Sequence, residues 1–162
     1  MDKQSFTREV KLAERSLYRI ARSYLPTDAD AADAVQEALT RAWMKRALLK
    51  EPQYFRTWLT RIMINACKDE LKKRRRVRDA AQQPEPAENP PMEAENELRA
   101  ALESLGPKYR VPLTLFYLDG YAIKEISKLL VLPQGTVKNR LFRAKQKLRT
   151  YLQQEEVFED EA

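Results

Sequence analysis

The sequence predicts an all-α protein with two small helical domains joined by a flexible linker, the second domain containing a helix-turn-helix. Helix-forming residues fill most of the 162 positions, and only 3 positions are glycine. Apolar residues recur at spacings of three and four, while runs of alternating β-branched residues are absent. The segment 80–95 is rich in proline and lacks aromatic residues, so it is expected to be a flexible linker between two groups of helices.

The N-terminal group, residues 1–78, is expected to form three helices. The first is predicted to end before Pro26, and Thr27 or Asp28 can cap the second. Pro52 suits the first turn of the third helix, which runs into the basic segment "KDELKKRRRVR" (68–78). Each helix has an apolar stripe that can face a common core. In the first helix this stripe consists of Leu12, Leu17, Ile20, Ala21, Tyr24 and Leu25.

The C-terminal group, residues 96–153, is expected to form four helices. The first is predicted to stop at a C-terminal glycine, Gly106, which Pro107 follows. The second ends at Asp119-Gly120, and the segments 122–130 and 134–149 then form a pair of helices joined by a short turn. A helix, a short turn and a second, basic helix are the helix-turn-helix arrangement of DNA-binding proteins.

The net charge of +6 is divided into blocks of opposite sign. Residues 1–78 carry +9 and residues 99–152 carry +8, whereas residues 79–98 carry −6 and residues 153–162 carry −5. The basic domains are therefore separated by an acidic linker, 79–95, and followed by an acidic tail, 154–162. The acidic segments are interpreted as solvated chain, and the basic domains indicate a polyanionic partner such as nucleic acid.

The last predicted helix places an aromatic ring on its basic side. At about 100° per residue, Val137, Leu141 and Leu148 share one stripe, and Phe142 lies roughly 130° from its centre. Phe142 is therefore expected to lie outside the core, and a plain helical hairpin with a solvated basic face is the alternative. The side chains around it are of kinds that contact bases or phosphates: Lys138, Asn139, Arg140, Arg143, Lys145, Gln146, Lys147 and Arg149.

Two features of the N-terminal group also point to partners. Tyr54, Phe55 and Trp58 precede the basic segment 68–78, and rings beside cations suit unstacked bases, although most of these rings are expected in the core. The second predicted helix carries Asp33 and Glu37 close together. An acidic helix in a basic domain does not favour DNA, so it indicates a basic protein partner or a favourable interaction with the helix dipole.

The chain has no histidine and a single cysteine, which excludes several chemistries. No Cys/His zinc site, intramolecular disulfide or histidine general base is possible, and we expect no enzyme, metal or cofactor. Cys67 is predicted to be a small buried side chain, and an unpaired thiol is typical of a reducing cytosol. No stretch approaches the roughly 20 apolar residues of a membrane helix, so a cytoplasmic protein without membrane contact is expected.

Three motifs in order resemble the extracytoplasmic-function sigma factors, the two-domain members of the sigma-70 family of bacterial RNA polymerase. "DAADAVQEALTRAW" (30–43) is similar to the family's D-A-E-D-x-x-Q-E-x-F-x-x-x-W. "FRTWLTRIMINACKDELKKRRR" (55–76) is similar to F-x-x-W-L-x-x-I-x-x-N-x-x-x-D-x-x-R-R. "GTVKNRLFRAKQKLR" (135–149) is similar to G-T-V-K-x-R-L-x-R-A-x-x-x-L. The resemblance covers nearly the whole chain.

The resemblance implies a sigma factor that directs RNA polymerase to promoters and assists melting of the −10 element. Residues 1–78 would be the region 2-like domain, and residues 96–153 the region 4-like domain. The implied partners are core RNA polymerase, through its β′ clamp and β flap, promoter DNA and an anti-sigma factor. The loop from about Arg46 to Gln53 would capture a flipped base.

The resemblance also implies a role for individual residues. Core polymerase would be bound by Asp33, Gln36 and Glu37. The −10 DNA would be bound by Trp58, Asn65, Asp69, Lys72, Lys73, Arg74, Arg75 and Arg76. The −35 DNA would be bound by Lys138, Asn139, Arg140, Phe142, Arg143, Lys145 and Lys147.

Some positions depart from the family pattern. Ala32 and Leu39 stand where the family usually has Glu and Phe, and Ala122 stands where Ser would cap the first helix of the pair. Val131 occupies a turn position that often holds Gly, and a β-branched residue disfavours positive φ there. The alternative function is a helix-turn-helix transcriptional regulator that acts without core polymerase, and a nucleic-acid enzyme comes third. A regulator would need neither the acidic helix nor the basic aromatic helix.

Overall fold

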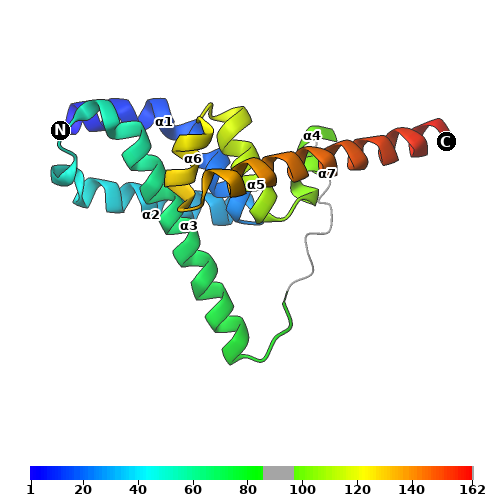
Figure 1. Ribbon diagram of the computed structural model, residues 1–162. Coiled ribbons are helices and arrows are strands. Elements are labelled where there is room, and N and C mark those ends of the chain that lie inside the picture. Colours follow the sequence, from blue (N-terminus) through cyan, green and yellow to red (C-terminus); the bar gives the residue numbers. More distant parts are fainter. Residues whose placement is uncertain (86–96, 162) are drawn as a thin grey trace. The chain divides into compact units, whose positions relative to one another are not determined.

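The computed structural model describes residues 1–85 and 97–161, and all regular secondary structure within these residues is helical. The chain divides into two compact units, Met1–Pro84 and Glu85–Ala162 (Figure 1). The predicted all-α class with two small helical domains is confirmed. Residues 86–95 of the predicted linker lie outside the described residues. Within the described ranges, no helix combines the length and the apolar character that crossing a membrane requires.

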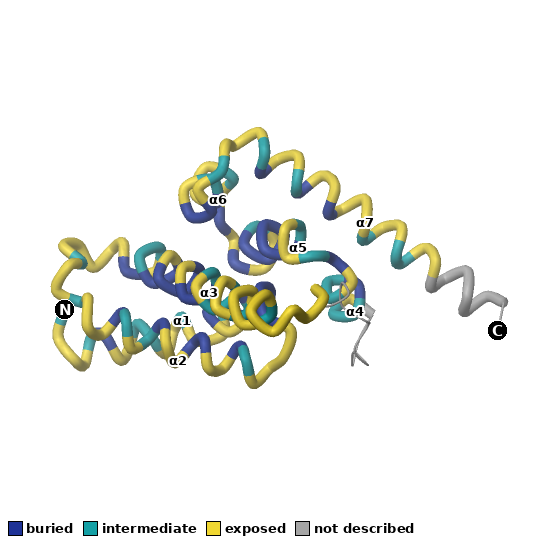
Figure 2. Tube along the Cα trace, turned by 90° about the horizontal axis from the view of Figure 1, so that it is seen from below, coloured by how far each residue is buried: buried dark blue, intermediate teal, exposed yellow. Residues whose placement is uncertain are grey.

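The first unit is a bundle of the helices α1 (Lys3–Tyr24), α2 (Asp28–Met44) and α3 (Phe55–Ala80). Each helix packs against the other two, and Figure 2 shows their buried residues gathered between them. Two 3-10 turns, η1 (Arg46–Leu48) and η2 (Pro52–Tyr54), connect α2 to α3. The core is mainly apolar, although Ser23 and Thr60 are also buried. Its largest fully buried side chains are Leu17, Ile20, Leu25, Leu59, Met63, Ile64 and Cys67.

Local signals set the ends of these helices. The Asp2 carboxylate accepts a hydrogen bond from the Ser5 amide at 2.7 Å, which caps α1. The Thr27 hydroxyl accepts one from the Asp30 amide at 3.1 Å, so Thr27 caps α2 as predicted. Helix α1 ends at Tyr24, shortly before Pro26. Pro52 begins the 3-10 turn η2 rather than α3 itself, because α3 begins at Phe55.

Leu12 is an exception to the predicted apolar stripe of α1. Its side chain is 77% exposed, whereas Leu17, Ile20 and Tyr24 are buried. At about 100° per residue, Leu12 lies roughly 130° from the centre of the buried arc and projects away from it. The prediction that Leu12 joins this stripe was wrong, because a spacing of five residues to Leu17 does not return to the same face of a helix.

Cys67 lies in the core of the first unit, as predicted. Burial is the main cause that raises the pKa of the Cys67 thiol to about 12, and the nearby carboxylate of Glu70 adds to the increase. The thiol is therefore protonated at neutral pH and packs as a small apolar group.

The described part of the second unit has the helices α4 (Glu97–Ser104), α5 (Pro107–Leu113), α6 (Ile123–Leu130) and α7 (Gln134–Glu161). A π-helical turn, η3 (Thr114–Leu118), continues α5. Helix α7 packs against α4, α5 and α6, around the fully buried Pro112, Leu115, Ile126 and Val137. Helices α6 and α7 form the predicted helix-turn-helix pair. The backbone of α7 continues to Glu161, through most of the predicted acidic tail.

Gly106 has a different role from the predicted one. Its φ of −68° is not left-handed, and it precedes α5 with Pro107 in the first turn. The carbonyl of Gly106 accepts hydrogen bonds from the amides of Tyr109 and Arg110, both at 3.0 Å. The buried guanidinium of Arg110 donates to the Leu105 carbonyl at 2.6 Å, beside the end of α4. The prediction of a C-terminal glycine was wrong, because Gly106 serves the helix that follows.

Val131, in the turn between α6 and α7, adopts a left-handed backbone conformation. Its φ is 56° and its ψ is 53°, which costs a β-branched residue about 1–2 kcal/mol relative to a residue without Cβ. The Leu132 amide donates to the Ser127 carbonyl at 3.0 Å, which closes the end of α6. At the start of α6, Ala122 offers no side-chain cap, but its amide donates to the Glu125 carboxylate at 3.0 Å.

Candidate nucleic-acid interface

The acidic side chains predicted to bind a protein lie on an exposed face of α2. Asp33, Gln36 and Glu37 are all exposed, at spacings of three and four that place them on one side of the helix. Asp33 and Glu37 line a groove of about 580 Å³ in the first unit. The structure therefore brings these three predicted residues together.

Helix α3 supplies the other side of this groove. Asn65 and Asp69 are exposed and one helical turn apart, and Asp69 lines the groove. Farther along α3, Lys73 and Arg76 also line it, while Lys72 and Arg75 are exposed elsewhere on the helix. The acidic side chains of α2 and the basic side chains of α3 therefore share one groove.

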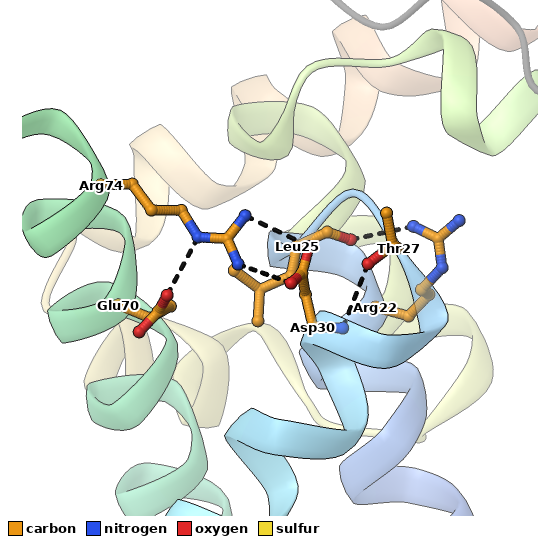
Figure 3. Close-up of polar contacts among 6 residues, drawn as sticks. All are labelled: Arg22, Leu25, Thr27, Asp30, Glu70 and Arg74. Atoms are coloured by element: carbon orange, nitrogen blue, oxygen red, sulfur yellow. Dashed lines mark hydrogen bonds and ion pairs between the residues drawn. The ribbon is translucent and has the colours of Figure 1, made fainter. Parts of the chain in front are cut away.

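Arg74 differs from its basic neighbours because its guanidinium is held between two helices (Figure 3). Its Nη2 lies 2.8 Å from Oδ1 of Asp30 on α2, and its Nη1 donates to Asp30 Oδ2 at 3.2 Å. Its Nε donates to Glu70 Oε1 at 3.0 Å, one turn back on α3. The pKa of Asp30 is lowered below its ordinary value of 3.8. The largest cause is the side-chain hydrogen bond with Arg74, and the second is a side-chain hydrogen bond with Thr27.

Arg22 adds to this cluster from α1. Its Nη1 donates to the Leu25 carbonyl at 2.9 Å, beyond the last turn of α1 (Figure 3). Its Nε forms an ion pair with Asp28 Oδ1 at 3.0 Å. The junction from α1 to α2 is therefore held by Arg22, while Arg74 ties the start of α2 to α3.

Arg41 forms a second bridge between α2 and α3. Its Nη1 lies 2.8 Å from Asp69 Oδ2 on α3, and its Nε lies 3.1 Å from Glu37 Oε1 on α2. Sequence reasoning missed Arg41, which connects a residue predicted for polymerase with a residue predicted for −10 DNA. The signal that was present is the spacing of four residues from Glu37, but its second partner comes from another helix.

The aromatic residues at the start of α3 and just before it divide between core and surface. Phe55 is buried, and its ring lies edge-on to Phe6 with centroids 5.8 Å apart. Trp58 is half-buried and lies 5.8 Å from the Phe55 ring. Tyr54 is 59% exposed at the end of the connection from α2. Trp58 and Tyr54 can therefore offer ring surface to a ligand, whereas Phe55 cannot.

On α7, the predicted separation of core and outer face is confirmed. Val137, Leu141 and Ala144 are buried, whereas Phe142 is 61% exposed. Arg140 is half-buried, and its Nε has no hydrogen-bond partner in the described part of the chain. The Nζ atoms of two lysines lie near tyrosine rings, Lys145 at 5.0 Å from the Tyr117 centroid and Lys147 at 5.2 Å from the Tyr109 centroid. The other predicted residues, Lys138, Asn139 and Arg143, are exposed.

Comparison with known proteins matches both units to one family. A family model for Sigma-70 region 2 matches residues 10–77, and one for Sigma-70, region 4 matches residues 95–148. An ECF RNA polymerase sigma factor, SigE of Mycolicibacterium smegmatis, is 33% identical over 148 residues, which are 84% of this chain and 57% of that protein. The ECF RNA polymerase sigma-E factor of Escherichia coli is 28% identical over 94% of this chain and 88% of that protein.

Solved structures with a similar fold include a sigma factor. The sigma factor RpoE in complex with the anti-sigma factor NepR, from Bartonella quintana, aligns with a TM-score of 0.75 and 25% identity. This alignment covers 91% of this chain and 96% of that one. CnrH in complex with the cytosolic domain of CnrY aligns with a TM-score of 0.68 and 25% identity, over 94% of this chain and 90% of that one.

Proposed function

We propose that this chain, which belongs to the extracytoplasmic-function sigma factors of the sigma-70 family, uses its two units to hold two separate promoter elements for RNA polymerase. It is a sigma factor, a non-enzymatic protein that directs RNA polymerase in transcription initiation. The observation that carries the proposal is the exposed acidic face of α2 beside the basic face of α3. A DNA-binding surface alone has no use for such an acidic face, but a protein that must hold DNA and polymerase together does.

The acidic face of α2 is proposed to bind the β′ clamp of core polymerase. Asp33, Gln36 and Glu37 are exposed and can accept hydrogen bonds from basic side chains of a partner. Two carboxylates one helical turn apart favour a cationic surface. The second unit is proposed to contact the β flap.

The first unit is proposed to bind the −10 element as melted DNA. Asn65 and Asp69 would read a flipped base, with Trp58 and the segment 46–53 beside it. Lys72, Lys73, Arg75 and Arg76 would hold backbone phosphates. Arg74 has a different proposed role, because its guanidinium is occupied by Asp30 and Glu70: it fixes α3 against α2. Flipping a base costs a few kcal/mol, which binding by both units and by polymerase must offset.

The second unit is proposed to read the −35 element as duplex DNA. Helix α7 presents Lys138, Asn139, Arg143 and the exposed ring of Phe142. Arginine pairs with guanine, asparagine pairs with adenine, and an apolar ring suits the methyl group of thymine. Arg140, Lys145 and Lys147 flank this face and would contact phosphates.

A regulator that acts without polymerase is disfavoured, because the first unit matches Sigma-70 region 2. An anti-sigma factor is a proposed partner, since RpoE is known in complex with the anti-sigma factor NepR. The cytoplasm is the proposed place of action, because the factor must meet RNA polymerase there and because its single thiol is unpaired.

The experiment that tests the proposal is a titration of the full chain with core RNA polymerase. Reversing Asp33 and Glu37 together to Lys should weaken binding by more than tenfold, because close charge pairs across an interface carry large coupling energies. The matched control is Glu14→Lys, which reverses an exposed charge on α1 away from the groove. Equal affinity of the double variant and the control would exclude α2 as the polymerase contact.

The role of unit 1 in −10 binding has its own measurement. Asp69→Ala should change base preference in open-complex assays on promoters varied at the −10 element. A change of preference confined to −35 positions would contradict the assignment.

A further inference from the structure

A second groove, of about 880 Å³, lies in the second unit between the corner joining α4 to α5 and the middle of α7. The described residues that line it include the cations Lys108, Arg143 and Lys147. None of the described lining residues carries a carboxylate. The lining also contains two tyrosines, Tyr109 and Tyr151. Three cations and no acid among the described lining residues give this groove a positive potential there, which favours an anionic ligand.

The ring of Tyr109 gathers two of these cations. The Nζ of Lys108 lies 5.6 Å from the ring centroid, and the Nζ of Lys147 lies 5.2 Å from it. Attraction to the ring holds each ammonium group near the groove but does not neutralise its charge. Two like charges held near one ring repel each other, and a bound anion between or beside them would remove that repulsion.

The groove is continuous with the proposed −35 surface. Arg143 follows Phe142 directly on α7 and is shared between the exposed reading face and the groove lining. Lys147 lies one turn farther along, about 6 Å by the rise of the helix. A duplex contacted by the first turns of α7 therefore has its backbone within reach of Lys147, and the Nζ of Lys108 lies near the same tyrosine ring.

We infer that this groove binds backbone phosphates of promoter DNA beside the segment that α7 reads, with Lys108 and Lys147 as the charged contacts and Tyr109 as the residue that positions them. The inference rests on the proposed reading of duplex DNA by α7, and it adds Lys108 and Tyr109 to the DNA-binding surface. Because phosphates are the same in every sequence, these contacts strengthen binding without selecting the promoter.

The test uses the full chain and a 30-base-pair duplex of mixed sequence, with affinity measured by fluorescence anisotropy at several salt concentrations. Lys108→Gln and Lys147→Gln should each lower the slope of log affinity against log salt by about one, and the double variant by about two. Tyr109→Leu should weaken binding at low salt, while Tyr109→Phe, which keeps the ring, should not. The control is Lys11→Gln, an equal loss of charge on an exposed position of α1.

Lys138→Gln separates this inference from the proposed function. If Lys138→Gln flattens the slope and the Lys108 and Lys147 variants do not, the groove is not a phosphate site, although α7 still binds DNA. If the groove variants flatten the slope and Lys138→Gln does not, the groove is supported and Lys138 is not a contact of the duplex. Unchanged slopes together with weaker binding to core polymerase would assign the groove to a protein and overturn the inference.

Discussion

The basic faces of α3 and α7 carry similar side chains in different electrostatic surroundings. On α3, Arg74 is held by Asp30 and Glu70, and Asp69 is held by Arg41 from α2. On α7, the cations from Lys138 to Arg149 form no ion pair with a described residue, and Lys145 and Lys147 lie near tyrosine rings instead. An ion pair occupies a guanidinium, whereas a ring leaves the ammonium charge available. The net charge of a helix therefore does not give the number of cations that it can offer to DNA. That number also depends on how many of its cations are already paired with side chains of the neighbouring helix.

The largest effect expected from this comparison concerns the unpaired Arg143. Arg143→Ala should remove about 1–3 kcal/mol of discrimination at one position of the −35 element, because one base loses its bidentate partner. The measurement is a set of titrations with duplexes varied at each −35 position. Lys145→Ala is the matched variant on the same helix, and it should weaken all sequences alike. Uniform weakening by both variants would mean that Arg143 contacts only phosphate.

The next effect separates a paired arginine from an unpaired neighbour. Arg74→Gln should lower the free energy of unfolding of the first unit by roughly 1–2 kcal/mol, since both partners are only partly exposed and Asp30 and Glu70 lose their cation. The salt dependence of DNA binding by the Arg74→Gln variant should stay the same as that of the parent chain. Arg75→Gln should do the opposite, with unchanged stability and a slope lower by about one. A flatter slope for Arg74→Gln would show that DNA displaces Asp30 from the guanidinium.

The pH dependence of the same variant follows from the lowered pKa of Asp30. A carboxyl whose pKa is lower in the folded state stabilises the fold above its ordinary value of 3.8 and loses that contribution as pH falls through the folded pKa. The stability difference between Arg74→Gln and the parent chain should therefore be constant above this value and shrink in more acidic solution. Thermal unfolding of both proteins over a pH series measures this stability difference.

The two units also differ in the side chains that adopt positive φ. In the second unit Val131 has a φ of 56°, and in the first unit Gln82 has a φ of 55° beyond the end of α3. Val131→Gly should raise the stability of the second unit by about 1 kcal/mol, since relief of the left-handed strain exceeds the entropic cost of glycine. Gln82→Gly should change the stability of the first unit less, because the side chain of Gln82 is unbranched. Thermal melts compare the two, and a destabilised Val131→Gly would mean that the valine side chain makes a contact that matters more than the strain.

The smallest effect on stability is expected for Phe142→Ala. Because the ring is 61% exposed, its loss should change the free energy of unfolding by less than about 0.5 kcal/mol, while DNA affinity falls. Leu141→Ala, the adjacent buried position, should cost about 2–5 kcal/mol. A melt of the full chain with each variant provides the measurement. Similar losses for both would place the Phe142 ring against a packed surface.

Features with a local cause could be predicted from the sequence. The cap at Thr27, the end of α1 before Pro26 and the strained turn at Val131 each depend on neighbours within a few residues. The exposure of Phe142 follows from the helical period alone once the stripe of Val137 and Leu141 is recognised.

Features that depend on another helix could not be predicted. The orientation of Arg74 is decided by Asp30, 44 residues earlier in the chain, and no local pattern separates it from Lys73 or Arg75. The role of Gly106 depends on the helix that follows it, and the groove at Tyr109 exists only because α7 passes across the short helix α5. Leu12 is a different case, because the information was local but was misread. Its apolar side chain suggested a core position, whereas its angular position on the helix places it on the exposed side.

The buried thiol of Cys67 has a practical consequence for measuring partner binding. Cys67 is the only cysteine of the chain, and it lies in the core of the first unit, so a thiol reagent can reach it only when that unit opens. With a pKa of about 12, little thiolate is present at neutral pH to react in the closed state. The labelling rate therefore reports the opening equilibrium of the first unit within the intact two-unit chain. A partner that binds only the closed form, at a concentration 100 times its Kd, would slow labelling about 100-fold. The labelling rate of Cys67, a side chain with no part in recognition, would thus measure partner binding to the first unit.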